Sequence, residues 1–146
     1  MFKHILLATD GSKTSAHAAA LAVDLARIHG AKLTALYVAD PYPYMGVGEL
    51  NPMGLQTYVA AGQQHAAQAH AQVDALCQSG GAPVALQARL VEDATAVNGI
   101  VETAQTEGAD LIVIGSHGRS GVARLVLGSV ATKVVAQSPV PVLVAR

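Results

Sequence analysis

The chain is poor in several residue types on which whole classes of function depend. Its 146 residues include one cysteine, Cys77, one phenylalanine and no tryptophan. A single cysteine cannot form an intramolecular disulfide, which is typical of proteins from reducing compartments. Aromatic residues make up only 3% of the chain, whereas proteins that bind single-stranded nucleic acids stack the bases on aromatic side chains. The composition therefore disfavours both a disulfide-stabilised fold and a base-stacking surface.

Basic blocks and long apolar runs are missing as well. The formal net charge is −1, which disfavours a nucleic-acid backbone as a partner. No apolar run approaches the roughly 18 residues of a membrane-spanning helix. Asp10 interrupts the apolar N-terminal run too early for a signal peptide. We therefore expect a cytoplasmic protein that binds neither nucleic acid nor a membrane.

Hydrophobic residues are abundant, and their spacing predicts alternating strands and helices. They make up 51% of the chain, enough at this length for one domain with a substantial core. Short apolar runs predict strands at residues 3–9, 32–38, 84–91, 111–114 and 140–144. Helical patterns lie between them at residues 12–29, 55–78, 93–107 and 128–137. This alternation predicts a single Rossmann-like α/β domain, 1–146, in which helices cover both faces of a parallel sheet in a three-layer sandwich.

Capping residues and apolar spacing predict how two of the helices begin and pack. Ser12 is a good N-cap for the first helix because its hydroxyl can accept from first-turn N–H groups. The same reasoning places Asp93 at the start of the third helix. Leu21, Leu25 and Ile28 recur at helical spacing and predict the apolar face of the first helix.

Two stretches depart from this regular pattern. Residues 39–54 are rich in proline and glycine and form a connector much longer than the usual length of about 4–6 residues, so we expect a functional or flexible insert. Its Tyr42, Tyr44 and Met45 predict a flap that packs on the protein itself or on a second copy, with a cover over adenine or a protein partner as the alternative. Asn98-Gly99 falls inside the third helix, where glycine costs about 1 kcal/mol relative to alanine.

The most informative stretch runs from Asp110 to Ser129. A buried-strand pattern, LIVI, is followed by the glycine-rich segment GSHGRSG and then by Gly128-Ser129, which opens another helical pattern. Glycines let the main chain approach an anion, and the first N–H groups of a helix point at it. A glycine-rich surface turn is the commoner alternative for such clusters in general. Here the position after a buried strand favours a phosphate site.

Asp10 directly follows the first strand and precedes Gly11-Ser12. An Asp-Gly pair is about as often a simple turn. Its alternative role is a carboxylate that accepts from ribose hydroxyls or holds a divalent metal ion bound to phosphates. Ligands of parallel sheets bind beyond the carboxyl ends of the strands, where the strand order reverses. If the first and fourth strands are neighbours, Asp10 and the glycine-rich loop face the same crevice.

These motifs together resemble the universal stress protein family, in its ATP-binding branch. The pattern Gly115-x-x-Gly118, nine residues and then Gly128-Ser129 is similar to the nucleotide signature of that family. The opening HILLATDGS and the closing SPVPVLV also resemble it, so the resemblance covers the whole chain. It implies a five-stranded parallel sheet in the order 3-2-1-4-5 and a homodimer. It also implies ATP in the crevice, with ADP or AMP as alternatives and with Mg²⁺ or Mn²⁺ beside the nucleotide.

The resemblance further implies nucleotide contacts at individual positions. These are Thr9, Asp10, Val38, Gly115, Gly118, Arg119, Gly128, Ser129 and Val130. Asp10 would meet the ribose or the metal ion, Thr9 would follow the ligand with its main chain, and Val38 would touch adenine. The glycines, Ser129 and the Val130 N–H would surround the phosphates. Arg119 is either a charge partner for phosphate or an exposed loop arginine, and His117 is expected to be a loop residue rather than a catalyst.

Motifs that are missing narrow the function further. The chain has neither a P-loop nor a Gly-x-Gly-x-x-Gly after a strand. None of its four lysines lies in the loop, so rapid phosphoryl transfer is not expected. We therefore expect a stress-response regulatory protein in which ATP is a ligand or switch. A slow ATPase or adenylyl-transferring enzyme, a dimeric interaction module without nucleotide and, least favoured, a phosphorylated receiver are the alternatives.

The last predicted strand, residues 140–144, carries a prediction about assembly. Pro139 and Pro141 cannot donate to a hydrogen-bond ladder, which is typical of a sheet edge. An apolar edge favours pairing with another chain. We therefore expect a homodimer through residues 140–144, together with a regulatory protein partner that the sequence does not identify.

Overall fold

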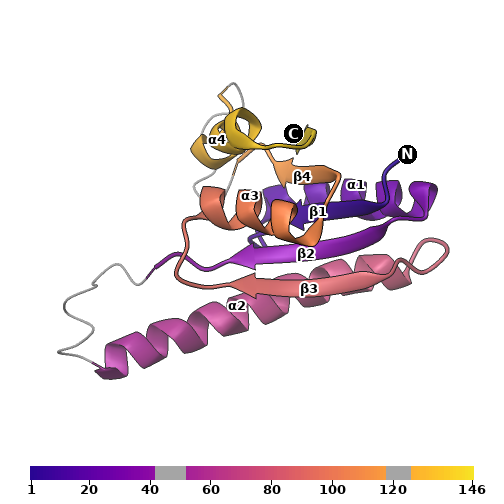
Figure 1. Ribbon diagram of the computed structural model, residues 1–146. Helices are drawn as coiled ribbons and strands as arrows, with labels where there is room; N and C mark the ends of the chain where they lie inside the picture. Colours follow the sequence, from indigo (N-terminus) through magenta and orange to yellow (C-terminus); the bar gives the residue numbers. More distant parts are fainter. Residues whose placement is uncertain (42–51, 118–125) are drawn as a thin grey trace.

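A computed structural model describes residues 1–41, 52–117 and 126–146 of the chain. Strands and helices alternate along it (Figure 1): β1 (His4–Ala8), α1 (Lys13–His29), β2 (Lys32–Val38), α2 (Pro52–Gln78), β3 (Leu86–Val91), α3 (Ala96–Glu107), β4 (Leu111–Gly115), α4 (Ser129–Gln137) and β5 (Val142–Ala145). Neighbouring strands are all parallel, in the order β3-β2-β1-β4-β5. The predicted fold class and strand order are therefore confirmed.

The central strands are buried on both faces, which explains their continuous apolar sequences. All of β4 is buried, and so is β1 up to its last residue. A strand without a solvent-facing side has no place for alternating polar residues, because buried polar groups need partners. The edge strand β3 is exposed or only partly buried along its length, and it is also the strand with the clearest alternation.

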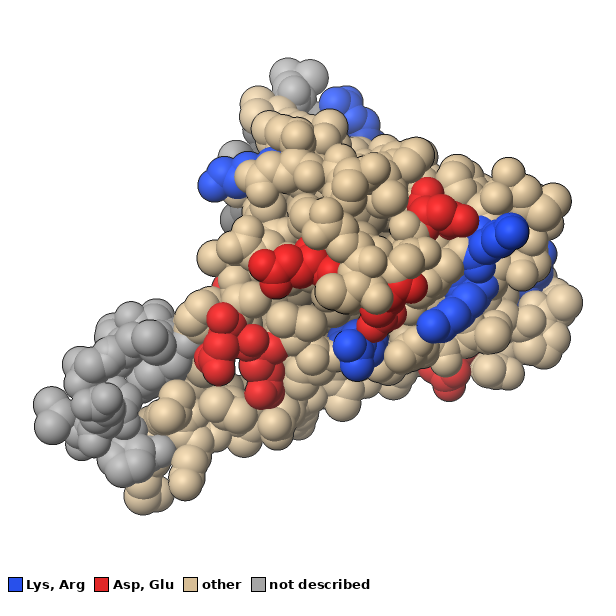
Figure 2. Space-filling model, in the orientation of Figure 1, with Lys and Arg blue, Asp and Glu red and all other residues tan. Residues whose placement is uncertain are grey.

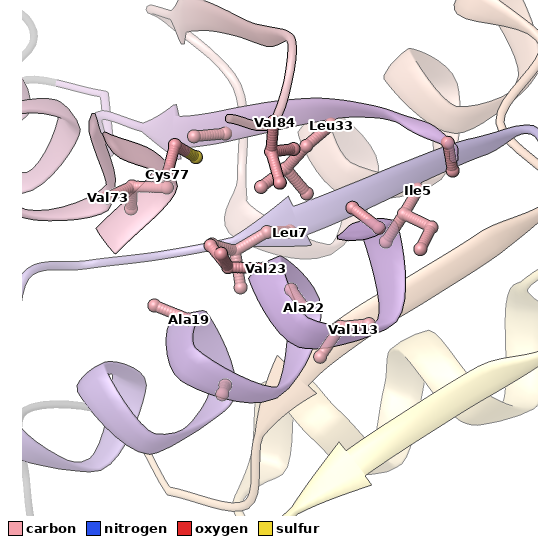
Figure 3. Packing of buried hydrophobic residues seen from close by; sticks show 14 of the residues in the cluster. Ile5, Leu7, Ala19, Ala22, Val23, Leu33, Val73, Cys77, Val84 and Val113 are labelled. Carbon is pink, nitrogen blue, oxygen red and sulfur yellow. The ribbon is translucent and has the colours of Figure 1, made fainter. Parts of the chain in front are cut away.

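Helices cover both faces of the sheet. α1 and the C-terminal half of α2 pack on one face, and α3 and α4 pack on the other (Figure 1). Figure 3 shows the first of these two cores, in which Ala22 and Val23 of α1 pack with Ile5 and Leu7 of β1. The sheet is therefore the middle of three layers, and only its strand ends and edges are open to other contacts.

The buried face of α1 consists mainly of small residues; Leu21 and Leu25 pack against the same core as predicted, and only Ile28 corrects the prediction. Ile28 is 76% exposed, and Leu21 and Leu25 are only partly buried. The buried positions are Ser15, Ala18, Ala19, Ala22, Val23 and Ala26. Small side chains let the helix lie close to the sheet, so the larger residues fall at the margins of the contact. The predicted cap is confirmed, because the Ser12 hydroxyl accepts from the Ser15 N–H at 3.3 Å.

α3 begins later than the sequence suggested, and Asp93 is not its N-cap. Asp93 has a φ of 58°, in the left-handed region. The cap is Thr95, whose hydroxyl accepts from the Asn98 N–H at 3.3 Å and whose backbone is extended. An N-cap side chain reaches the first-turn N–H groups from such an extended backbone. The outer strands also begin slightly later than predicted, β3 at Leu86 and β5 at Val142.

α2 is the longest helix of the described chain, and its N-terminal part extends past the end of β3 (Figure 1). Most of the predicted flexible insert, 39–54, falls at residues 42–51 and therefore lies outside the described residues, as do Tyr42, Tyr44 and Met45. Within the described ranges, no helix combines the length and apolarity needed to cross a membrane. Figure 2 shows acidic and basic side chains scattered over the middle of the face it presents, with several of opposite sign next to one another.

Candidate functional site

The carboxyl ends of the strands open into a cleft of about 920 Å³. It lies over the tips of β2, β1 and β4, where the strand order reverses. Its lining residues are 8–10, Ser15, 36–40, Leu55, Tyr58, Val59, Ala61, Gly62, His65, Glu92, Asp93, Ala96, Ile100, 114–117 and 126–131. Every layer of the fold contributes to the cleft, so its shape depends on the packing of the whole domain.

One end of the cleft is formed by the loop after β4 and by the start of α4. The Gly128 N–H donates to the Ser116 carbonyl at 2.7 Å and so joins the two described ends of the loop. A Cβ at position 128 would lie 2.8 Å from the Ser116 oxygen, so this approach requires glycine. Gly128 is also the N-cap of α4, and no side chain caps that helix. The first-turn N–H groups of α4 are thus placed to face an anion in the cleft.

His117 and Thr14 hold the same loop in place from two sides. The Thr14 hydroxyl donates to the His117 carbonyl at 2.7 Å. The His117 ring lies within hydrogen-bond distance of the Ser116 hydroxyl (3.0 Å) and of the Val126 carbonyl. His117 therefore bridges the two described ends of the loop, in agreement with the prediction of a loop residue. Sequence reasoning did not find Thr14, because its partner is brought near only by the pairing of β1 with β4.

Asp10 and Thr9 form the middle of the cleft, at the tip of β1. One Asp10 carboxylate oxygen accepts from the Ser12 N–H at 2.9 Å, which is the turn geometry weighed above. The Thr9 hydroxyl accepts from the Gly11 N–H at 3.2 Å. Asp10 nevertheless lines the cleft. The turn and the ligand role are therefore compatible, because the turn fixes the carboxylate at the cleft wall.

The opposite end of the cleft, built on the tip of β2, has an apolar wall beside the carboxylates that follow β2 and β3. Val38 lies there with Ala96 and Ile100 of α3. The backbone beyond Val38 is held in the sheet by a hydrogen bond from the Ala39 N–H to the Val91 carbonyl, at 2.8 Å. Such a wall suits a flat apolar group, such as the face of a nucleobase, better than a phosphate.

α2 contributes a wall that the sequence pattern did not reveal. Tyr58 and His65 line the cleft from this helix, and the Tyr58 hydroxyl donates to the Asp40 carbonyl at 2.9 Å. Gly62 approaches the chain after β2, where its Cβ would meet that of Ala39 at 3.9 Å. The only indication of this wall in the sequence is the position of the helix directly after the long connector.

Charge is distributed unevenly along the cleft. Its acidic residues are Asp10, Asp40, Glu92 and Asp93, which follow β1, β2 and β3, and the described lining holds no lysine or arginine. The N-terminus of α4, with its partial positive charge, lies at the other end beside β4. An anionic group is therefore favoured over β4 and disfavoured over β2 and β3. Across the described ranges, no group of three or more His, Cys, Asp and Glu side chains could hold a metal ion on its own.

The cleft brings together every predicted site residue that the structure describes. Thr9, Asp10, Val38, Gly115, Gly128, Ser129 and Val130 all line it. Gly118 and Arg119 lie outside the described residues. The contacts of all these residues with a ligand stay predictions.

A family model for the universal stress protein family matches residues 1–146. A universal stress protein from Thermus aquaticus is 38% identical over 151 aligned residues, covering 100% of both chains. The solved structure of universal stress protein UspA from Lactobacillus plantarum superposes with a TM-score of 0.78 at 27% identity, covering 99% of this chain and 97% of that one. A universal stress protein solved in complex with cAMP has a TM-score of 0.68 at 26% identity and covers 99% and 97% of the two chains.

Proposed function

The chain belongs to the universal stress protein family, and from that premise we propose that it is a stress-response regulatory protein that binds an adenine nucleotide, ATP in the first place, in the cleft over β2, β1 and β4. The observation that carries the proposal is the polarity of this cleft. A helix N-terminus without a side-chain cap forms one end, and an apolar wall forms the other. A nucleotide has the same polarity, with phosphates at one end and a flat base at the other.

The orientation of the ligand follows from the charges. Phosphates would lie at the start of α4, against the N–H groups of Ser129 and Val130 and the loop at Gly115 and Gly128. The base would lie against Val38, two strands away in the sheet. Adjacent strands are about 4.8 Å apart, so these two ends are separated by roughly 10 Å, which suits a nucleoside phosphate. The relative solved with cAMP supports an adenine nucleotide as the ligand.

A divalent cation fits the same arrangement. The described lining carries four carboxylates, those of Asp10, Asp40, Glu92 and Asp93, without a lysine or arginine. A bare triphosphate would be repelled by this acidic wall, whereas Mg²⁺ or Mn²⁺ would neutralise part of its charge and accept a carboxylate oxygen as ligand. Of these residues, Asp10 lies at the strand tip beside the phosphate end and would hold the cation or the ribose hydroxyls. Arg119 would add a second positive charge.

Rapid turnover is not part of the proposal. Rapid phosphoryl transfer uses a lysine or arginine held on the γ-phosphate together with a group that orients water. The described lining holds no lysine or arginine, so Arg119 is the only such side chain in the proposal. Nucleotide would instead favour one state of the protein over another.

We extend the proposal to a homodimer through residues 140–144, because β5 is an edge strand with partly buried apolar residues. Sedimentation in dilute buffer should then give a dimer, and a monomer would contradict this extension.

The central experiment is calorimetry with ATP, AMP and CTP, each with and without Mg²⁺, on protein freed of nucleotide by denaturation and refolding. Saturable binding of MgATP is expected, weakened at least tenfold when Mg²⁺ is removed. The denaturing extract of freshly purified protein should contain an adenine nucleotide on chromatography. A folded protein that gives no heat with any nucleotide would leave only the dimeric interaction module. Release of phosphate from ATP faster than in buffer without protein would favour the alternative of an ATPase.

Asp10→Asn separates the two roles of Asp10. Asparagine keeps an oxygen that can accept from the Ser12 N–H, so the turn and the melting temperature should persist. The variant loses the negative charge that a metal ion or ribose hydroxyl would use. We therefore expect at least a tenfold weaker affinity for MgATP, and wild-type affinity would show that Asp10 serves the turn alone.

A further inference from the structure

Gly99 occupies an unusual place in the molecule. It lies inside α3, where glycine is the least favourable residue apart from proline, and it is buried. A Cβ at this position would lie 2.8 Å from Cγ2 and 3.0 Å from Cγ1 of Val38. Both methyl groups of Val38 therefore occupy space that any other residue at position 99 would fill.

Val38 has few directions in which to yield. It pairs with Val91 in the sheet register, and the next residue, Ala39, is hydrogen-bonded to the Val91 carbonyl at 2.8 Å. On the other side, the Thr9 N–H donates to the Leu36 carbonyl at 2.9 Å. These bonds fix the backbone of β2 near its end. A crowded Val38 must therefore respond with its side chain, because its backbone is held in the sheet.

α3 is fixed as well. Thr95 caps its start, and its Ile100 and Ala104 are buried in the core shared with β1, β2 and β4. A methyl group at position 99 would therefore be accommodated mainly by rotation or displacement of the Val38 side chain toward the cleft. Optimal carbon contacts lie at about 3.5–4.0 Å, so the displacement needed is roughly 1 Å.

We infer that Gly99 is a specificity-determining positioning residue: by carrying no side chain, it lets Val38 withdraw toward α3 and leaves the base end of the cleft wide enough for a purine. The inference rests on the proposed function, because it assumes that the base lies against Val38. A wall displaced by about 1 Å obstructs a two-ring base more than a one-ring base. Gly99 thus acts through Val38 and need not touch the ligand.

The test compares the affinities of Gly99→Ala for MgATP and MgCTP with those of the wild-type chain. We expect MgATP binding to weaken at least tenfold and MgCTP binding to change less than threefold, so the ratio of the two affinities falls. Removing the crowded methyl groups in the double variant Gly99→Ala/Val38→Ala should restore the ratio to that of Val38→Ala alone. A loss of general fold integrity would weaken both ligands together and would not be rescued.

Asn98→Ala is the matched control. It makes an exposed substitution at the adjacent position of α3 and raises helix propensity in the same way, so both affinities should stay at wild-type values. If Gly99→Ala does not fold, Val38→Ile tests the contact from the other side, because its extra methyl group must also turn toward the cleft. An unchanged ratio in either variant overturns the inference while leaving the proposed function standing. A wild-type chain that binds neither nucleotide overturns both.

Discussion

Gly128→Ala probes the joint between the β4 loop and α4 on which phosphate binding depends. The Gly128 N–H and the Ser116 carbonyl are 2.7 Å apart, and a Cβ at position 128 would lie 2.8 Å from the same oxygen. The carbonyl belongs to the backbone and is held close by this hydrogen bond, and the Ser116 N–H is bonded to the Ala145 carbonyl at 2.7 Å. The added methyl group must therefore push the two ends of the loop apart.

Three effects set the size of the loss. Alanine is a poorer N-cap than glycine by about 0.5–1 kcal/mol, a weakened hydrogen bond contributes about 0.5–1.5 kcal/mol, and relief of the clash adds about 1 kcal/mol or more. Because the effects overlap, we expect the free energy of unfolding to fall by about 2–3 kcal/mol. For a domain of this size, the melting temperature should fall by roughly 5–10 °C.

Urea unfolding and calorimetry with MgATP measure the two consequences. The affinity should fall at least tenfold, because the first turn of α4 moves relative to the loop. Gly128→Ser separates crowding from capping, since serine carries the same Cβ but is a better cap than alanine. If crowding dominates, serine is nearly as harmful as alanine. Gln137→Ala, at the exposed far end of α4, is the control. Wild-type stability and affinity in Gly128→Ala would show that the close approach of Gly128 to Ser116 is not needed for the fold or for phosphate binding.

Three further predictions concern polar groups away from the cleft. Thr34→Val removes a fully buried hydroxyl that lies 2.7 Å from His4 Nε2 and donates to the Glu107 carboxylate at 3.2 Å, so urea unfolding should show a loss of about 1–3 kcal/mol. Burial of the Asp110 carboxyl by itself raises its pKa, but hydrogen bonds from the Lys3, His4 and Asp110 N–H groups and the His4 charge lower it overall. That carboxylate therefore stabilises the fold above about pH 4, and the effect is lost as the pH falls through the lower native pKa. Asp110→Asn should have a lower free energy of unfolding than the wild type at pH 7, and the difference should shrink at pH 3. Burial lowers the pKa of His70, although backbone hydrogen bonds with Arg89 and Ala35 oppose the shift. The free energy of unfolding should therefore decrease as the pH falls below about 6.5. His70→Leu should make the free energy of unfolding less dependent on pH in this range.

Each of these has a result that contradicts it. A Thr34→Val chain as stable as the wild type would mean that His4 and Glu107 find other partners. A constant deficit of Asp110→Asn at every pH would show that the carboxylate charge is irrelevant. A His70→Leu chain with the wild-type pH slope would assign the slope to another group.

Much of the fold could be predicted because its signals are local. Continuous apolar runs marked the buried strands, and Ser12 marked the start of α1. The errors arose where local signals compete. Asp93 is as good a capping residue by type as Thr95, but only the backbone conformation decides between them. Ile28 matches a helical apolar face by spacing, yet it is exposed because the alanines of α1 lie closer to the sheet.

The candidate site was predictable to the extent that it consists of strand tips and glycines. Asp10, Gly115 and Gly128 were found because each follows a strand or opens a helix. Tyr58, Thr14 and the wall formed by α2 were not found, since their roles depend on partners far away in sequence.

By itself, the amino-acid order determined the elements, their alternation and the family, because these depend on periodicity and on motifs read over a few neighbouring residues. The reason for Gly99 inside a helix and the place of the apolar wall in the cleft became apparent only from the packing of the layers. Those properties arise from distances between α3 and β2, and from the position of Val38, Ala96 and Ile100 at the end of the cleft opposite the N-terminus of α4. Distances of this kind exist only after the layers have packed.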